Sequence, residues 1–381
     1  MALSQNANLT VLKLGYNNLG DSGVTILASG IAVHKSLMSL DLGFNNFGDE
    51  GCKALAQAMQ QAAQIFHGGT LQTLYLAGNL IGEDGALAMA DFIRQGCSLK
   101  KLYMTGNRIG AEGVKAITEA ILEDELRIVE RVDAENPAND GSKATAAKTF
   151  HGMQELFFGG TGMGSAGCHS VSRLLEKTSF LRVLSMPNCN MTDDEICVLA
   201  SGMRANREKL SVESIQLSFN GMTARGLEAL MNAVWGSATL RELRIDNNEI
   251  GDRGANQLAA ILPGLKNLEI LDVGFNSIKA PGLNTLMKAV AESQRLLSLS
   301  VSGNAIDVAA AKAVAYALAY NRSLESLFLV HCTITHEGQR HISAGIVSNS
   351  KVALRNLTGF DMGRKLFNCA RFDLVRYYLL V

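Results

Sequence analysis

Residues 37–51 read LMSLDLGFNNFGDEG, and this stretch carries the frame that decides the fold. Leucines stand at positions 37, 40 and 42, followed by Asn45, Phe47 and Gly51. Apolar and polar residues alternate at the end of the leucine segment, which is typical of a half-buried strand. After Gly51, apolar residues recur at helical spacing among strong helix formers. The stretch therefore predicts a strand, a tight turn and a helix in succession.

The same frame returns along most of the chain. Its first apolar position is occupied by Leu9, Leu37, Leu71, Leu99, Met153, Leu181, Val212, Leu240, Leu268, Leu296 and Leu324. Most neighbouring positions in this series are 28 residues apart, which leaves room for a helix in each unit. With one irregular unit, we count about twelve repeats. Because each repeat packs only on its neighbours, 381 residues need no second core.

The asparagine that follows each predicted strand has a structural reason to be there. Its amide can satisfy backbone groups that the turn would otherwise bury unpaired, each at a cost of about 1–3 kcal/mol. Thr161, Cys189 and Cys332 occupy the same position in other units, and all are small enough to take over part of this role. The later glycine of the frame permits close packing or a positive φ at the start of the helix.

These residues resemble the ribonuclease-inhibitor-like subfamily of leucine-rich repeats. Stretches such as Asn17–Gly23 and Asn248–Gly254 are similar to the repeats of NOD-like receptors. The resemblance implies an α/β solenoid curved into a horseshoe, with a parallel sheet on the concave face and helices on the convex face. Members of this family bind proteins through the concave face or its rims, in roles from enzyme inhibition to immune regulation and GTPase activation.

The frame breaks in three places. About six extra residues around Gln60 to Gly69 predict a bulging loop. An irregular unit near 127–152 fills the strand frame weakly, with Val129 and Val132, and contains a turn-rich stretch but no clear helix. The frame is lost again after Val352. We therefore expect repeats over residues 1–351 and a C-terminal cap or tail over residues 352–381.

The composition limits the classes of partner and indicates the cellular compartment. The 35 Lys and Arg residues nearly balance the 36 Asp and Glu residues, so no overall field favours nucleic acid or an anionic membrane. The 7 cysteines are scattered without a C-x-x-C pair, which favours reduced thiols over a disulfide framework. We find neither a signal peptide nor 18 uninterrupted apolar residues. These features predict a cytoplasmic protein.

Catalytic and cofactor motifs are scarce. The stretch 162–167 matches G-x-G-x-x-G, but Met163 and Gly167 fall on the repeat frame. His331, Cys332, His336 and His341 could suggest a metal, yet the frame points their side chains apart. We therefore predict no enzyme activity, no cofactor and no metal. Two other functions stay open: a GTPase-activating protein of the Ran type, whose Arg-Asn-Arg loop is matched only by Asn107-Arg108, and a structural subunit of a large assembly.

The residues at the outward-facing position of each strand are expected to form the partner-binding surface. This surface lies on the concave face and would bind a protein. Tyr75 and Tyr103 stand on adjacent strands, and Phe157 follows after the irregular unit. Exposed aromatic residues on such a face are frequent interface anchors. The alternative is that these rings only cover the sheet or stack on one another. The partner-binding residues that we predict are Tyr75, Tyr103, Phe157, Phe44, Asp41, Phe219, Arg244, Asp272, Phe275 and Phe328.

Overall fold

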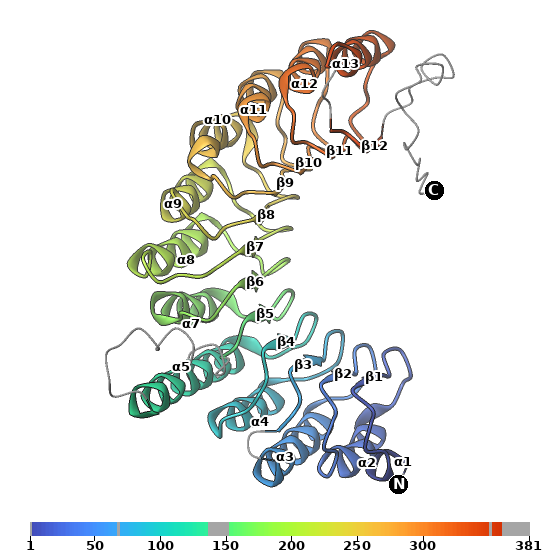
Figure 1. Cartoon of the computed structure of the whole chain (residues 1–381), viewed down its shortest axis with the longest axis vertical. Helices are drawn as coiled ribbons and strands as arrows, with labels where there is room; N and C mark the ends of the chain where they lie inside the picture. Colours follow the sequence, from blue (N-terminus) through green and yellow to red (C-terminus); the bar gives the residue numbers. More distant parts are fainter. Residues whose placement is uncertain (1, 67–68, 136–151, 350–352, 360–381) are drawn as a thin grey trace. The chain divides into compact units, whose positions relative to one another are not determined.

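The computed structural model describes residues 2–66, 69–135, 152–349 and 353–359. The chain divides into two compact units, the first made of residues 1–190 with 201–212 and the second of residues 191–200 with 213–381. Within each unit, short parallel strands and helices alternate along the chain, and the helices cover one side of the strands (Figure 1). The expected α/β repeat solenoid is confirmed.

The strands of each unit are three residues long and pair in chain order. In the first unit they are β1 (Val11–Lys13), β2 (Ser39–Asp41), β3 (Thr73–Tyr75), β4 (Lys101–Tyr103), β5 (Glu155–Phe157) and β6 (Val183–Ser185). In the second unit they are β7 (Ser214–Gln216), β8 (Glu242–Arg244), β9 (Ile270–Asp272), β10 (Ser298–Ser300), β11 (Ser326–Phe328) and β12 (Asn356–Thr358). The register places equivalent residues of successive repeats side by side.

A helix follows the strand in every complete repeat, and the short helix α1 precedes the first strand. In the first unit the helices are α1 (Ala2–Gln5), α2 (Gly20–Ile31), α3 (Asp49–Ile65), α4 (Glu83–Arg94), α5 (Gly110–Glu135) and α7 (Gly164–Lys177). Helix α8 (Asp193–Ala205) contributes residues to both units. In the second unit they are α9 (Ala224–Val234), α10 (Gly251–Ile261), the short 3₁₀ helix η1 (Leu262–Gly264), α11 (Ala280–Glu292), α12 (Val308–Tyr320) and α13 (His336–Ser348). From Leu37 on, the frame leucines are buried between strands and helices, whereas those of the first repeat are half-buried.

The asparagines form the predicted internal ladder. The amide of Asn107 donates to the carbonyl oxygens of Leu76 and Met104, at 2.9 Å each, and its oxygen accepts from the Ile81 N–H at 3.1 Å. In the second unit, the Asn276 amide donates to the carbonyl oxygens of Ile245 and Gly274, at 2.9 Å each, and its oxygen accepts from the Ile250 N–H at 3.4 Å. Cys189 and Cys332 take the same place with longer contacts from Sγ to a carbonyl oxygen. Each ladder residue ties two neighbouring repeats together.

A second ladder of aspartates was not predicted. The Asp49 carboxylate accepts from the backbone N–H groups of Gly82 and Gly85, at 2.7 and 2.9 Å, and so caps the helix of the next repeat. Asp252 does the same for Lys279 and Gly282. A Cβ on Gly85 would lie 2.8 Å from the Asp49 carboxylate and 2.7 Å from Ile81. This frame glycine therefore serves close packing.

The structure differs from two of the predicted breaks in the repeat frame. The extra residues after Gln60 lengthen α3, which continues to Ile65, so most of them form helix and not a loop. Val129 and Val132 lie in α5 and fill no strand position, because helix formers continue without Gly or Pro as far as Glu135. The turn-rich stretch 137–141 lies outside the described residues.

The frame also continues beyond Val352. Leu354 and Leu357 are buried, and β12 pairs in register with β11, where Leu357 lies opposite Leu327. The spacing of 30 residues from Leu324 to Leu354 had hidden this strand. Residues 360–381 lie outside the described part of the chain, and the division at 351 stays a prediction.

Candidate protein-binding surface

The predicted residues fall into two groups, one in each unit. The outward position at the end of a strand carries Asp41, Tyr75, Tyr103 and Phe157 in the first unit, and Arg244, Asp272 and Phe328 in the second. Three residues beyond such a position stand Phe44 in the first unit, and Phe219 and Phe275 in the second. Side chains on one face of a parallel sheet stand in rows across the strands. The repeat pattern in the sequence therefore specified the row of side chains to which each of these residues belongs.

Three rings of the first unit form a continuous stack, which we call the ring ladder: Tyr75, Tyr103 and Phe157. The ring centroids of Tyr75 and Tyr103 are 4.0 Å apart with planes 19° from parallel. Those of Tyr103 and Phe157 are also 4.0 Å apart, with planes at 13°. The rings are half-buried. They thus stack on one another, as the alternative interpretation expected, and still present their edges on the strand face.

Charged groups fix the middle of the ring ladder. The Tyr103 hydroxyl donates to Glu155 Oε2 at 3.1 Å, and Lys101 Nζ lies 2.7 Å from Glu155 Oε1. Burial, followed by the neighbouring Tyr75 hydroxyl and the Glu155 carboxylate, raises the pKa of Tyr103 well above its ordinary range. Tyr103 therefore stays a neutral hydrogen-bond donor. Lys101 and Glu155 were not predicted, although their place two residues before Tyr103 and Phe157 marks them as members of the same face.

In each unit, further aromatic residues lie where the strands turn toward the helices. Tyr16, Phe44, Phe219 and Phe275 all adopt positive φ, between 52° and 61°, which bulky residues rarely do. The Tyr16 and Phe44 rings stack at 4.5 Å with planes 6° apart. A Cβ on Gly78 would lie 2.3 Å from the Phe44 ring, so this glycine makes room for it. Phe219 is 57% exposed and is open for contact.

The strand face of the second unit is polar. Arg244 pairs with Glu242 on its own strand, and Ser214 Oγ donates to Glu242 at 2.8 Å. Burial raises the pKa of Asp272, although Asp272 Oδ1 accepts from the Gly274 N–H at 3.0 Å. Phe328 stands in register between Ser300 and Thr358. Of the three predicted side chains of this face, Arg244 and Asp272 lie opposite each other on adjacent strands, and Phe328 lies two strands beyond Asp272.

The described residues offer no candidate metal centre, and part of the motif that suggested a GTPase activator has a structural role. Within them, no three His, Cys, Asp or Glu side chains are grouped so that they could hold a metal ion. Asn107 of the Asn107-Arg108 motif is buried in the asparagine ladder. No helix among the residues described is both long and apolar enough to cross a membrane.

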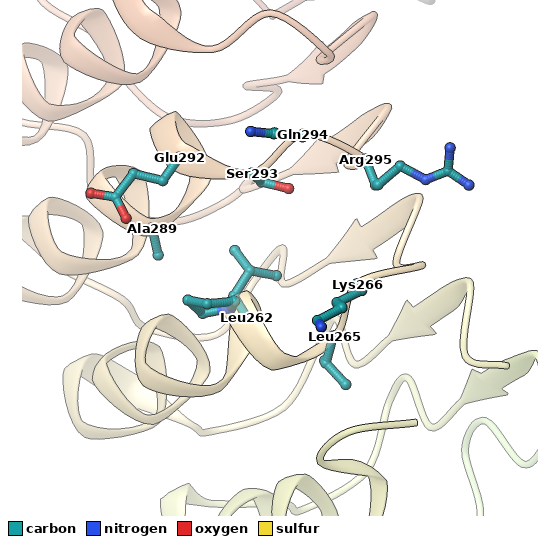
Figure 2. A pocket seen from close by; sticks show the side chains of 9 residues that line it. Leu262, Leu265, Lys266, Ala289, Glu292, Ser293, Gln294 and Arg295 are labelled. Atoms are coloured by element: carbon teal, nitrogen blue, oxygen red, sulfur yellow. The ribbon is translucent and has the colours of Figure 1, made fainter. Parts of the chain in front are cut away.

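A cavity of about 380 Å³ lies in the second unit, between η1 and the end of α11. Figure 2 shows Glu292 and Arg295 pointing to opposite sides of it, with Leu262 and Leu265 along one wall. Its polar groups do not converge on a common point. None of the predicted binding residues lines it.

Sequence comparison places the repeats among known ones. The family described as Leucine Rich repeat matches residues 5–28, 33–56, 97–117, 209–231, 236–259 and 264–287. Leucine-rich repeat-containing protein 73 of Rattus norvegicus and that of Homo sapiens are each 28% identical to the chain over 118 residues. This match covers 31% of the chain, and the chain spans only 37% of the length of these relatives.

Structure comparison agrees on the fold. The crystal structure of the Rad7 and Elc1 complex in yeast is similar over 87% of this chain and 72% of that chain, with a TM-score of 0.54 and 14% sequence identity. At this identity the similarity concerns the fold alone. The six matched segments are thus similar to leucine-rich repeats in sequence, and the alternating strands and helices share their fold with this solved structure.

Proposed function

We propose that this chain, a leucine-rich-repeat protein, is a non-enzymatic interaction scaffold or regulator that binds a protein partner through the strand face of its first unit. The ring ladder carries this proposal. Stacked, half-buried rings lose little conformational entropy when a partner covers them, and aromatic residues in such positions dominate many interfaces. The loops that bear Phe44 and Tyr16 border the same face.

We further propose that the repeats are of the ribonuclease-inhibitor-like subtype and that the protein works in the cytoplasm. The length of the helices supports the subtype, since α3 has 17 residues and α10 has 11. The six cysteines within the described residues form no disulfide, which fits a reducing compartment.

The test is to replace Tyr75, Tyr103 and Phe157 together by Ser and to measure capture of the partner. The partner is first identified by affinity purification of the unaltered chain and mass spectrometry. We expect the triple variant to bind at least about 100-fold more weakly, because anchor residues each contribute about 2 kcal/mol or more. Circular dichroism should show an intact fold.

A matched control comes from the second unit. Gln216, Arg244 and Phe328 occupy the same strand position, so replacing these three by Ser removes a similar outward row. We expect this variant to keep its partner, a result that would exclude Arg244 and Phe328 from the partner-binding residues predicted from the sequence. Equal recovery of the partner by the unaltered chain and by the ring-ladder variant would refute the proposed surface.

A further inference from the structure

A five-residue motif occurs twice on the strand faces. Residues 41–45 read DLGFN and residues 272–276 read DVGFN, each beginning at the outward position of a strand. In both copies the aspartate Oδ1 accepts from the N–H of the glycine two residues later, at 3.0 Å. In both copies the phenylalanine ring lies over a glycine of the next repeat, Gly78 or Gly303. The two aspartates are therefore held in the same way by their own turns.

The neighbours of the two aspartates differ. Strand β10 places Ser300 opposite Asp272 on one side, and strand β8 places Arg244 opposite it on the other. Strand β3 places Tyr75 opposite Asp41. The ring ladder covers one face of Tyr75 with Tyr103, and its other face is turned toward the strand that carries Asp41. On the side of the following strand, Asp272 faces a hydroxyl and Asp41 faces the open end of an aromatic stack.

The geometry at this end points to one occupant: we propose that Asp41 and Tyr75 together bind an arginine side chain of the protein partner. This inference rests on the proposed binding face. A guanidinium is planar, so it can continue the stack of rings on the outer face of Tyr75. Its N–H groups can at the same time donate to the Asp41 carboxylate. An ammonium group matches the charge but cannot continue the stack.

The surroundings favour a cation at this end and not at the other. At the far end of the ring ladder, the residue opposite Phe157 is Ser185, which is buried and carries no charge. Gly15 and Gly43 border Asp41, and a Cβ on either would lie 3.3–3.4 Å from its carboxylate, so their lack of side chains leaves space there. Lys13 is exposed on β1 beside Asp41, and no ion pair joins the two in the described structure. A partner arginine would compete with Lys13 for this carboxylate.

The experiment is an amide-resolved NMR titration of the full chain with N-acetyl-arginine methylamide. The Gly43 and Gly274 amides are matched reporters, because each donates to the aspartate of its own motif at the same distance. We expect the Gly43 resonance to shift in a saturable manner and the Gly274 resonance to stay in place. The citrulline analogue, which is uncharged, should shift neither, and the lysine analogue should bind more weakly than the arginine derivative.

Single substitutions test whether Asp41 and Tyr75 are the residues that bind the arginine derivative. Asp41→Asn keeps an acceptor for the Gly43 N–H and removes the charge, and Tyr75→Leu removes the ring. We expect each variant to bind the arginine derivative about fivefold more weakly. The matched variant Asp272→Asn should bind the derivative as tightly as the unaltered chain. Equal shifts at Gly43 and Gly274, equal binding of citrulline or lysine, or unchanged binding by Asp41→Asn would each overturn the inference.

These outcomes are separable from failure of the proposed function. If Asp41→Asn captures the partner normally while the triple replacement of the ring ladder abolishes capture, the binding face stands and the arginine site is wrong. If the triple replacement has no effect on capture, the face itself is wrong, whatever the titration gives.

Discussion

The two units are built on one scaffold but present different strand faces. In the first unit, Tyr75, Tyr103 and Phe157 stack across three strands. In the second, the same outward position carries Arg244 and Asp272, with charges and hydroxyls around them. The register is parallel and in chain order in both. The repeat therefore fixes where an outward side chain stands, and the residues that occupy the outward positions decide what the face can bind.

If the scaffold is equivalent in both units, removal of a ladder asparagine should cost the same in each. We predict that Asn107→Ala and Asn276→Ala each lower the free energy of unfolding by about 3 kcal/mol, because each leaves several buried backbone groups unpaired. Native-state hydrogen exchange measures the loss separately in each unit.

The control is Gln57→Ala on the exposed side of α3, which should change stability by no more than about 0.5 kcal/mol. A loss below about 1 kcal/mol for either asparagine would show that the ladder supports only one unit.

One buried acidic residue in each unit is expected to make the stability of that unit depend on pH, and the two dependences have opposite directions. In the first unit, burial raises the pKa of Glu125 to about 7, although its carboxylate accepts from Thr178 Oγ1 at 2.6 Å. In the second, partial burial works to raise the pKa of Asp193, but hydrogen bonds from Thr223, Gly226 and Arg225 outweigh it, so the pKa falls below its ordinary value. The two shifts have opposite signs.

The consequence for Glu125 is a loss of stability as pH rises. Below the ordinary pKa of 4.5 neither the folded nor the unfolded state is ionised, and between 4.5 and about 7 the unfolded state ionises first. We predict that Glu125→Gln, which keeps an acceptor for Thr178, stabilises the first unit by up to about 3 kcal/mol at pH 8 and leaves it unchanged at pH 4. Urea unfolding at the two pH values measures the gain. A gain that is the same at both would contradict the raised pKa.

Asp193 should show the reverse dependence. Its folded-state pKa is lowered, so its contribution is present above the ordinary pKa of 3.8 and is lost as pH falls through the folded value. Asp193→Asn is therefore expected to destabilise the second unit at pH 7, and this cost should shrink below pH 3.8. It serves as the matched comparison for Glu125→Gln.

The sequence was sufficient for the scaffold because buried positions repeat. Leu74 and Asn79 recur with the same spacing in other units, so one pattern predicts strand, turn and core. It failed where the pattern is not periodic: α5 continues through Val129, and the strand after Leu354 follows an altered spacing. The candidate binding face was predicted only as rows of side chains. That Tyr75 and Tyr103 stack, and that Asp41 and Asp272 meet different neighbours, depends on side-chain contacts across strands that no single repeat encodes.

The smallest effect tests the ring ladder itself. A double-mutant cycle with Tyr75→Ser and Tyr103→Ser should give a coupling of about 1 kcal/mol in the free energy of unfolding, because stacked cross-strand rings stabilise each other by about this amount. The matched pair is Gln216 and Arg244, which are also in register on adjacent strands. Arg244 pairs with Glu242 on its own strand, so we expect coupling below about 0.5 kcal/mol there.

Equal coupling in the two pairs would mean that the rings contribute no more to the sheet than polar neighbours do, and the difference between the two faces would then lie in binding alone. Coupling confined to the tyrosines, combined with loss of the partner in the triple variant, would show that the stack is held in place before a partner arrives. A preformed stack costs less to bind than rings that must first be ordered, because their rotamer entropy has already been lost on folding. The cycle thus separates the stacking role of the rings from their role as anchors, which the sequence left as alternatives.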